Sequence, residues 1–317
     1  MQTITILIPA YNEAESLIAT HSMICGIIDK IVDIDWTFLF VNDGSTDDTA
    51  LILDQLRNSD PRVQILTLSR NFGKENAMLA GMDYARGDAL LIMDADGQHQ
   101  PDIIPQMIAR WRAGIDDVYA LRSSRDTDSP LRRSLSNAYY RLLQKSTDMD
   151  ILPNAGDYRL LDRRCVDALR TLRESQRYTK GLYSWIGFKK EAVSYEHLPR
   201  KAGKSNFSIR KLFRLAFEGI TSFTVAPLRF AMLLGIIVSM CAFAYIIFTI
   251  CKTIFYGEPV QGYPTLLCCI LFLGGVQLIA IGIIGEYIGR IFMESKRRPP
   301  YIVSQFTGTK PDTDEKC

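Results

Sequence analysis

Short apolar runs alternate with longer segments of helical period through the first part of the chain. The runs are Ile4–Ile8, Phe38–Val41, Val63–Leu68, Ala89–Met93 and Val118–Leu121. Between them, segments such as Glu13–Ile31 and Asp47–Arg57 repeat apolar residues at three- and four-residue spacing, which is the period of one helix face. Strands that alternate with helices predict an α/β domain, with a parallel sheet covered by helices on both faces.

Two long uncharged segments follow closer to the C-terminus. Phe230–Cys251 and Val260–Gly285 contain no Asp, Glu, Lys or Arg, and each is long enough to cross a hydrocarbon core of about 30 Å as a helix. The alternative is a pair of buried helices in a soluble core, but soluble helices of this length rarely lack a charge. The pattern therefore predicts a two-helix transmembrane hairpin.

Basic residues flank this predicted hairpin. They are Arg210, Lys211, Arg214 and Arg229 before the first span, and Arg290, Lys296, Arg297 and Arg298 after the second. The connecting loop carries only Lys252 and Glu258. Since basic flanks stay on the cytoplasmic side, both termini are expected in the cytoplasm.

The segment just before the first span has an amphipathic helical period. Its apolar positions are Ile209, Leu212, Phe213, Ala216, Phe217 and Ile220, with basic residues between them. Periodicity alone fits a core-facing helix of a soluble domain equally well. Its position directly before a span favours a helix that lies in the headgroup region.

Composition adds limits to this picture. A chain of 317 residues exceeds one typical domain, and its net charge of +2 comes from 37 basic and 35 acidic residues. Such a balance gives no argument for nucleic acid as a partner. The seven cysteines show no paired spacing, which fits a reducing compartment, and no cleaved signal is expected from the short apolar run Ile4–Ile8.

Polar clusters directly follow three of the predicted strands. They are Pro9–Glu13, Asn42–Ser45 and Asp94–Gly97. Any one of them could be an ordinary turn or helix cap, but the carboxyl ends of parallel strands meet at one sheet edge, where ligands bind. Acids gathered there require a compensating cation, and Mg²⁺ or Mn²⁺ would take carboxylate together with phosphate oxygens. The clusters therefore predict a site for a metal-bound diphosphate.

These motifs carry a family resemblance. Pro9-Ala10-Tyr11-Asn12-Glu13, Val41-Asn42-Asp43-Gly44-Ser45-Thr46-Asp47 and Asp94-Ala95-Asp96 together resemble the inverting GT-A glycosyltransferases of family 2. Asn71-Phe72-Gly73-Lys74-Glu75, Gly156-Asp157-Tyr158-Arg159-Leu160-Leu161-Asp162 and the two-span segment narrow the resemblance to polyprenyl-phosphate glycosyltransferases. That group contains dolichyl-phosphate mannose synthases and bacterial bactoprenol glucosyltransferases, and the resemblance covers Ile4 to about Tyr301.

The resemblance implies a division of the chain and of the donor site. Residues 1–204 would be a cytoplasmic GT-A catalytic domain, 205–228 an interfacial amphipathic helix, 229–290 the hairpin and 291–317 a cytoplasmic tail. The residues implied for the nucleotide-sugar are Pro9, Tyr11, Glu13, Asp43 and Asp94, and those for Mg²⁺ or Mn²⁺ are Asp94, Asp96 and Gln98. No other cofactor is implied. His99 follows the metal motif but is expected to be structural.

Asp157 and Asp96 would be the catalytic acids by the same resemblance. A phosphate acceptor has a second pKa of about 6 and needs no strong base, so Asp157 could instead orient the sugar or stabilise charge on its ring. The alternative is a loop acid that pairs with Arg159 or Arg163. The acceptor phosphate needs cations near the membrane, and the candidates are Arg122, Arg133, Arg200, Lys204 and Ser205.

The expected function is transfer of glucose from UDP-glucose to undecaprenyl phosphate at the inner membrane, for cell-envelope products such as O-antigen. Transfer of mannose or a modified sugar stays open, because these motifs do not specify the sugar. A processive polysaccharide synthase fits less well, since Gln176-Arg177-Tyr178 lacks the Gln-x-x-Arg-Trp spacing. A nucleotide-sugar sensor or membrane scaffold without turnover is the alternative of another class. Expected partners are a second copy of the chain, a flippase and a downstream glycosyltransferase.

Overall fold

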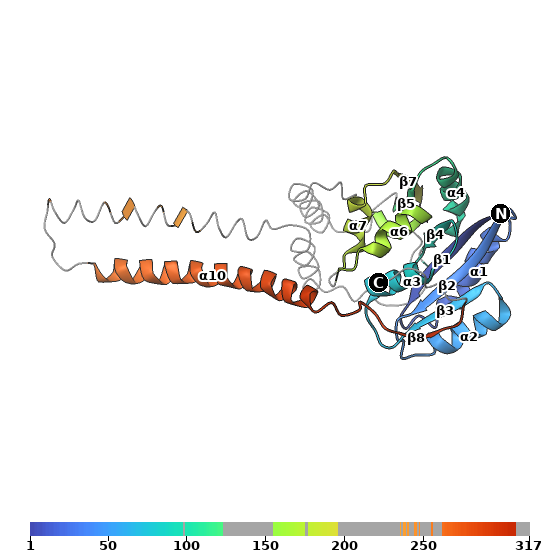
Figure 1. Ribbon diagram of the computed structural model, residues 1–317, viewed down its shortest axis with the longest axis horizontal. Helices are drawn as coiled ribbons and strands as arrows, with labels where there is room; N and C mark the ends of the chain where they lie inside the picture. The colour runs from blue at the N-terminus through green and yellow to red at the C-terminus, as the bar shows by residue number, and fades with distance from the viewer. Residues whose placement is uncertain are drawn as a thin grey trace. The chain divides into compact units, whose positions relative to one another are not determined.

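The computed structural model describes residues 1–97, 99–122, 155–174, 177–195 and 262–308, together with single positions between 235 and 255. The chain forms two compact units (Figure 1). The first joins Met1–Ser208 with Arg298–Cys317, and the second is Ile209–Arg297. The predicted interfacial helix at 205–228 lies outside the described residues.

The first unit is built on one sheet, which has eight strands within the described ranges. The strands are β1 (Gln2–Ala10), β2 (Ile34–Asn42), β3 (Val63–Leu68), β4 (Ala89–Ile92), β5 (Asp117–Arg122), β6 (Ala155–Asp162), β7 (Lys190–Tyr195) and β8 (Val303–Phe306). Their order in the sheet is β7-β5-β6-β4-β1-β2-β3-β8. All five strands expected from the apolar runs are confirmed, with bounds that shift by a few residues.

The expected parallel pairing is confirmed for β1 to β4, but the sheet as a whole is mixed. β1 runs parallel to β2 and β4, β2 to β3, and β5 to β7. β6 is antiparallel to both β4 and β5, and β8 is antiparallel to β3. Residues 156–162 were expected to carry a family motif and were not predicted as a strand, and strand direction cannot be read from a local apolar pattern.

Helices cover both faces of the sheet, as expected. They are α1 (Leu17–Ile28), α2 (Thr49–Ser59), α3 (Lys74–Tyr84), η1 (Pro101–Ile103), α4 (Ile104–Arg112), α6 (Arg163–Thr171) and α7 (Thr179–Trp185). Ile4, Ile6 and Ile8 of β1 pack in one cluster with buried residues of α1, α2 and α4. Leu7 points to the other face, where a Cβ at Gly81 of α3 would lie 2.1 Å from its Cδ1. Burial on both faces explains why the central strands are almost continuously apolar.

Strand β8 brings the C-terminal segment back into the first unit. Its register pairs Leu66 with Phe306 and Leu68 with Val303. The flanking backbone continues this pairing, since the Ser69 N–H donates to the Ile302 carbonyl at 2.9 Å. Residues 291–317 were expected to form a cytoplasmic tail, and this strand was not predicted from the sequence.

The second unit contains one long helix within its described residues, α10 (Tyr263–Ser295), which overlaps the second predicted span. Its stretch Phe272–Ser295 is apolar and long enough to cross a membrane, and none of that stretch is buried inside the structure. Most of the first predicted span lies outside the described residues, although the positions described between 235 and 255 are helical.

Candidate active site

Strand pairing brings two acids of the predicted site together. Antiparallel β4 and β6 pair Ala89 with Asp162 and Ile92 with Arg159. Continuing that register by two residues sets Asp94 opposite Asp157. The start of β6 therefore lies at the same sheet edge as the end of β4, which only an antiparallel strand allows.

Lys74, the first residue of α3, bridges these two acids. Its Nζ lies 2.6 Å from Oδ1 of Asp94 and 2.8 Å from Oδ2 of Asp157. Burial alone would lower the pKa of Lys74, but the two carboxylates outweigh it and raise that pKa. Burial would likewise raise the pKa of Asp157, yet nearby cations, Lys74 foremost, bring it below its usual value. Lys74 is therefore an ammonium and Asp157 a carboxylate at neutral pH.

The alternative partners of Asp157 are engaged elsewhere. Arg159 donates from Nη1 to Oδ2 of Asp117 at 2.6 Å. Arg163 donates from Nε to Oδ1 of Asp167 at 3.0 Å. The interpretation of Asp157 as a loop acid paired with either arginine is wrong.

One oxygen of Asp157 has no hydrogen-bond partner within the described part of the chain. Its Oδ1 is buried and has no hydrogen bond among the residues that the structure describes. The side chain is 9% exposed. An unsatisfied buried carboxylate oxygen costs on the order of 1–3 kcal/mol or more, so this atom is suited to a ligand that donates to it or coordinates it.

Asp43 holds the turn that precedes Lys74. Its two oxygens accept the backbone N–H groups of Phe72 at 2.7 Å and Gly73 at 2.9 Å. Gly73 has φ +91°, a conformation that L side chains rarely adopt. Asp43 is 2% exposed, and burial raises its pKa while the two N–H groups act in the opposite direction. Its role at the nucleotide stays a prediction, because the structure shows it binding backbone.

The loops after β1 and β2 are joined to each other. Asn12, at φ +55°, donates its N–H to Ser45 Oγ at 3.1 Å, and its side-chain oxygen accepts the Thr46 N–H at 2.9 Å. The Glu13 N–H donates to Thr49 Oγ1 at 2.9 Å. Two of the three predicted polar clusters thus meet at one edge of the sheet.

The predicted donor residues of the first loop differ in exposure. Pro9 is the second-last residue of β1 and pairs with Val41 of β2. Tyr11 is 45% exposed, so its ring is accessible to a ligand. The Glu13 carboxylate accepts the Ser16 hydroxyl at 2.9 Å, which anchors it to the start of α1.

The loop after β4 is held by a hydrogen bond to a buried histidine, whose ring stacks on a tyrosine of β6. Nδ1 of His99 accepts the Asp94 N–H at 3.1 Å. The His99 ring stacks on Tyr158, with centroids 4.7 Å apart. His99 is buried, which fits the structural role expected for it, whereas Asp96 is partly exposed at the edge.

Most of the remaining predicted residues fall outside the part of the chain that the structure describes. Those outside the described residues are Gln98, Arg133, Arg200, Lys204 and Ser205. Arg122 ends β5, but its side chain is not among those described. The acceptor-phosphate set therefore stays a prediction.

Sequence reasoning missed Lys74. Its segment was used for the family resemblance, but the lysine was given no role. A usable signal was present, because Lys74 follows the third strand at the edge that carries the acidic clusters. Its neighbour Glu75 was also missed, and the Glu75 carboxylate accepts the N–H of Thr179 at 3.0 Å and the hydroxyl of the same residue.

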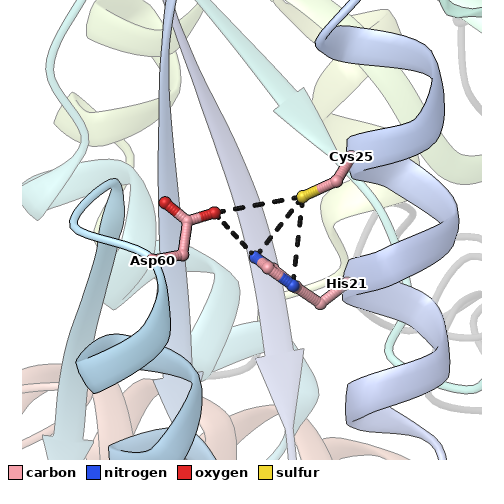
Figure 2. A group of neighbouring side chains, drawn as sticks. All are labelled: His21, Cys25 and Asp60. Carbon is pink, nitrogen blue, oxygen red and sulfur yellow. Dashed lines mark hydrogen bonds and ion pairs between the residues drawn. The ribbon is translucent and has the colours of Figure 1, made fainter.

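A second group with metal-ligand side chains lies near the start of β3 (Figure 2). His21 Nε2 lies 3.1 Å from Oδ2 of Asp60, and Cys25 Sγ lies 3.6 Å from His21 Nε2. Arg62 already neutralises this group, since its Nη2 donates to Asp60 at 2.9 Å and to Cys25 Sγ at 3.4 Å. Burial raises the pKa of Cys25 to about 11, so the thiol stays protonated. We interpret the group as a structural network.

The first unit, with its mixed sheet and the acids beyond the carboxyl end of β4, has the fold of a GT-A glycosyltransferase. The family model for glycosyl transferase family 2 matches residues 5–170, and the model for the GtrB C-terminal hairpin matches residues 226–291. The chain belongs to glycosyl transferase family 2, which confirms the resemblance seen in the motifs.

Curated relatives align over nearly the whole chain. The bactoprenol glucosyl transferase of Shigella phage SfV is 43% identical over 300 residues, covering 95% of this chain and 97% of the relative. The prophage bactoprenol glucosyl transferase homolog of Escherichia coli K12 is 42% identical over 302 residues, covering 95% and 98%. The SfII prophage-derived bactoprenol glucosyl transferase of Shigella flexneri is 43% identical over 302 residues, covering 95% and 97%.

Proposed function

We propose that the protein transfers glucose from UDP-glucose to undecaprenyl phosphate and forms a polyprenyl-monophosphate-glucose. The observation that carries this proposal is the placement of Asp94 and Asp157 within reach of one lysine, in a chain that aligns over 95% of its length with a bactoprenol glucosyl transferase. Two acids held by one lysine at the carboxyl edge of the sheet suit a donor that carries a diphosphate beside a reactive sugar carbon.

The nucleoside end of the donor is assigned to the first two loops. The exposed ring of Tyr11 offers a face on which a base can stack. Pro9 and Glu13 flank that ring in the chain, and Asp43 supports the next loop. Asp94, which follows β4, is assigned to the diphosphate end.

The side chains suit a divalent cation. Asp94 is partly exposed at the end of β4, Asp96 lies two residues on, and Asp157 keeps one buried oxygen without a hydrogen bond among the described residues. Hard ions such as Mg²⁺ and Mn²⁺ take oxygen ligands of this kind. We assign the ion to Asp94, Asp96 and Gln98. When bound, the ion would neutralise the charge of the departing diphosphate.

The reaction joins an acceptor phosphate oxygen to the anomeric carbon of glucose, with inversion. The bond from that carbon to the donor diphosphate breaks, and UDP leaves with the electron pair. The acceptor is largely a dianion at neutral pH because its second pKa is about 6, so no strong base is required. Ionised Asp157 then serves to orient the sugar and to stabilise positive charge on its ring.

We assign binding of the acceptor phosphate to basic residues expected near the membrane surface. Arginine binds phosphate in bidentate fashion and lysine as a point charge, and we assign the acceptor phosphate to Arg122, Arg133, Arg200, Lys204 and Ser205. We propose that the protein crosses the inner membrane with two spans, and that both termini and the catalytic domain are cytoplasmic. Support comes from the apolar length of α10 and from the match to a hairpin model.

The product constrains the partners. A glucosyl lipid made on the cytoplasmic face must be moved across the membrane and then consumed, so a flippase and a downstream glycosyltransferase are expected to act after this protein. We also expect self-association.

A panel of donors tests the proposal. Membranes that contain the protein are incubated with undecaprenyl phosphate, Mg²⁺ or Mn²⁺, and a series of UDP- and GDP-sugars. We expect UDP-glucose to give the fastest transfer, and Asp96→Asn to lose at least about 100-fold in rate. Asp54→Asn, an exposed acid on α2, is the matched control. Full transfer by the Asp96→Asn protein would contradict the site assignment.

A further inference from the structure

The backbone around Lys74 is fixed on both sides. Asp43 accepts the two N–H groups just before it, and Glu75 just after it accepts from Thr179. The Lys74 side chain is nevertheless 43% exposed. An anchored backbone with a partly exposed side chain is the arrangement of a ligand-binding lysine, since positioning is provided by groups other than the ligand.

The charge balance of the site explains why an anionic substrate needs a cation here. Asp94 and Asp157 are both ion-paired to the one ammonium of Lys74, so these three groups carry one net negative charge. That charge opposes the approach of an anionic substrate. An ammonium has three N–H donors, and two carboxylates leave one of them for a further acceptor.

We propose that Lys74 is a phosphate-binding residue, whose ammonium donates to a substrate phosphate oxygen from its place between Asp94 and Asp157. This inference rests on the proposed function, which brings two phosphate sources to the site: the donor diphosphate and the lipid phosphate. Both offer the same anionic oxygen, and binding measurements tell them apart.

The donor source is tested by the affinity of the purified full-length protein for UDP and for uridine, both in EDTA. We expect Lys74→Met to weaken UDP binding by at least about tenfold, the size of a charge-assisted contact, and to leave uridine binding unchanged. Lys30→Met removes an exposed lysine after α1 and should leave both affinities unchanged. Thermal unfolding of each variant establishes that the protein is folded.

A double variant separates direct binding from neutralisation. Lys74→Met alone makes the site more negative, which would weaken UDP binding even without a direct contact. Lys74→Met combined with Asp157→Asn restores the original net charge. If Lys74 binds phosphate directly, the double variant stays defective, whereas recovery of wild-type UDP affinity would overturn the inference.

The lipid source is tested with undecaprenyl phosphate in detergent micelles, and undecaprenol is the control without phosphate. If Lys74 serves the acceptor, UDP affinity stays unchanged in Lys74→Met while affinity for the lipid phosphate falls by about tenfold or more. Unchanged affinity for both phosphates would overturn the inference. Since these are binding measurements, they are independent of whether glucose is the transferred sugar. The proposed function fails separately, if the wild-type protein forms no glucosyl lipid.

Discussion

The hydroxyl of Tyr301 donates a 2.5 Å hydrogen bond to Oδ2 of Asp83, and this bond ties the segment just before β8 to helix α3. Arg173 binds the same carboxylate through Nη1 at 2.6 Å and Nη2 at 2.9 Å. Helix α3 begins at Lys74. The C-terminal segment is therefore bound to the same helix that supplies a cation to the site.

Loss of this hydroxyl should destabilise the first unit. We expect Tyr301→Phe to lower its free energy of unfolding by about 1–3 kcal/mol, the usual contribution of a hydrogen bond to a charged group. All three tryptophans of the chain, Trp36, Trp111 and Trp185, lie in that unit, so their fluorescence in detergent follows its unfolding. Tyr11→Phe, at an exposed ring, should change the free energy little. Equal stability of the two variants would contradict the prediction.

Close packing between β1 and α3 can be tested at a glycine. A Cβ at Gly81 would lie 2.1 Å from Leu7 Cδ1, so Gly81→Ala should cost about 1–3 kcal/mol through overpacking. Gly26 in α1 meets nothing within 4 Å, and Gly26→Ala should be neutral or stabilise by up to about 1 kcal/mol, as for a helix interior. Chemical denaturation measures both. A neutral Gly81→Ala would show that the two elements are less tightly packed.

The turn before Lys74 depends on a buried carboxylate. Asp43 accepts from two backbone N–H groups, and an amide in its place has one oxygen and a nitrogen that cannot accept. Asp43→Asn should therefore lower the free energy of unfolding by about 1–3 kcal/mol and weaken UDP binding at the same time. Asp54→Asn is the exposed control. Full stability in the Asp43→Asn protein would mean that the turn does not need the charge.

Stability should fall in mild acid because of His21. Burial lowers the pKa of His21, although Asp60 and Asp29 act in the opposite direction, and Arg62 adds to the lowering; Cys25 also faces the ring. The unfolded chain therefore takes up a proton below about pH 6.5 that the folded protein resists. The free energy of unfolding is therefore undiminished by His21 above pH 6.5. It falls as the pH drops below 6.5, by at most about 1.4 kcal/mol per pH unit.

Comparing wild type with His21→Gln isolates this titration. Unfolding free energies between pH 8 and pH 5, from tryptophan fluorescence, should fall less steeply in the variant. Identical slopes for the two proteins would assign the acid sensitivity to other groups.

The sequence predicted the elements well but not their long-range pairing. Apolar runs and polar turns are local signals, so the five strands and the clusters at Asn12, Asp43 and Asp94 could be found without a structure. The direction of β6, which sets Asp157 beside Asp94, depends on a partner strand distant in sequence. The hydrogen bond from the Phe72 N–H to the Asp43 carboxylate likewise joins residues 29 positions apart in the sequence.

Other features had no local signal strong enough to use. Val303–Phe306 is too short a strand to stand out after a long apolar segment, and it is defined by pairing with β3. Lys74 resembles any basic residue at a helix start until both carboxylates are placed around it. These gaps are of one kind, since each depends on a contact between residues distant in sequence.

The most direct measurement is the mass of the lipid formed from UDP-glucose and undecaprenyl phosphate by the purified protein with Mg²⁺ or Mn²⁺. The proposed function predicts a lipid that carries one hexose on one phosphate, and predicts that Asp157→Asn loses most of it. A diphosphate-linked lipid, or no glucosyl lipid from wild-type protein that binds UDP, would contradict it.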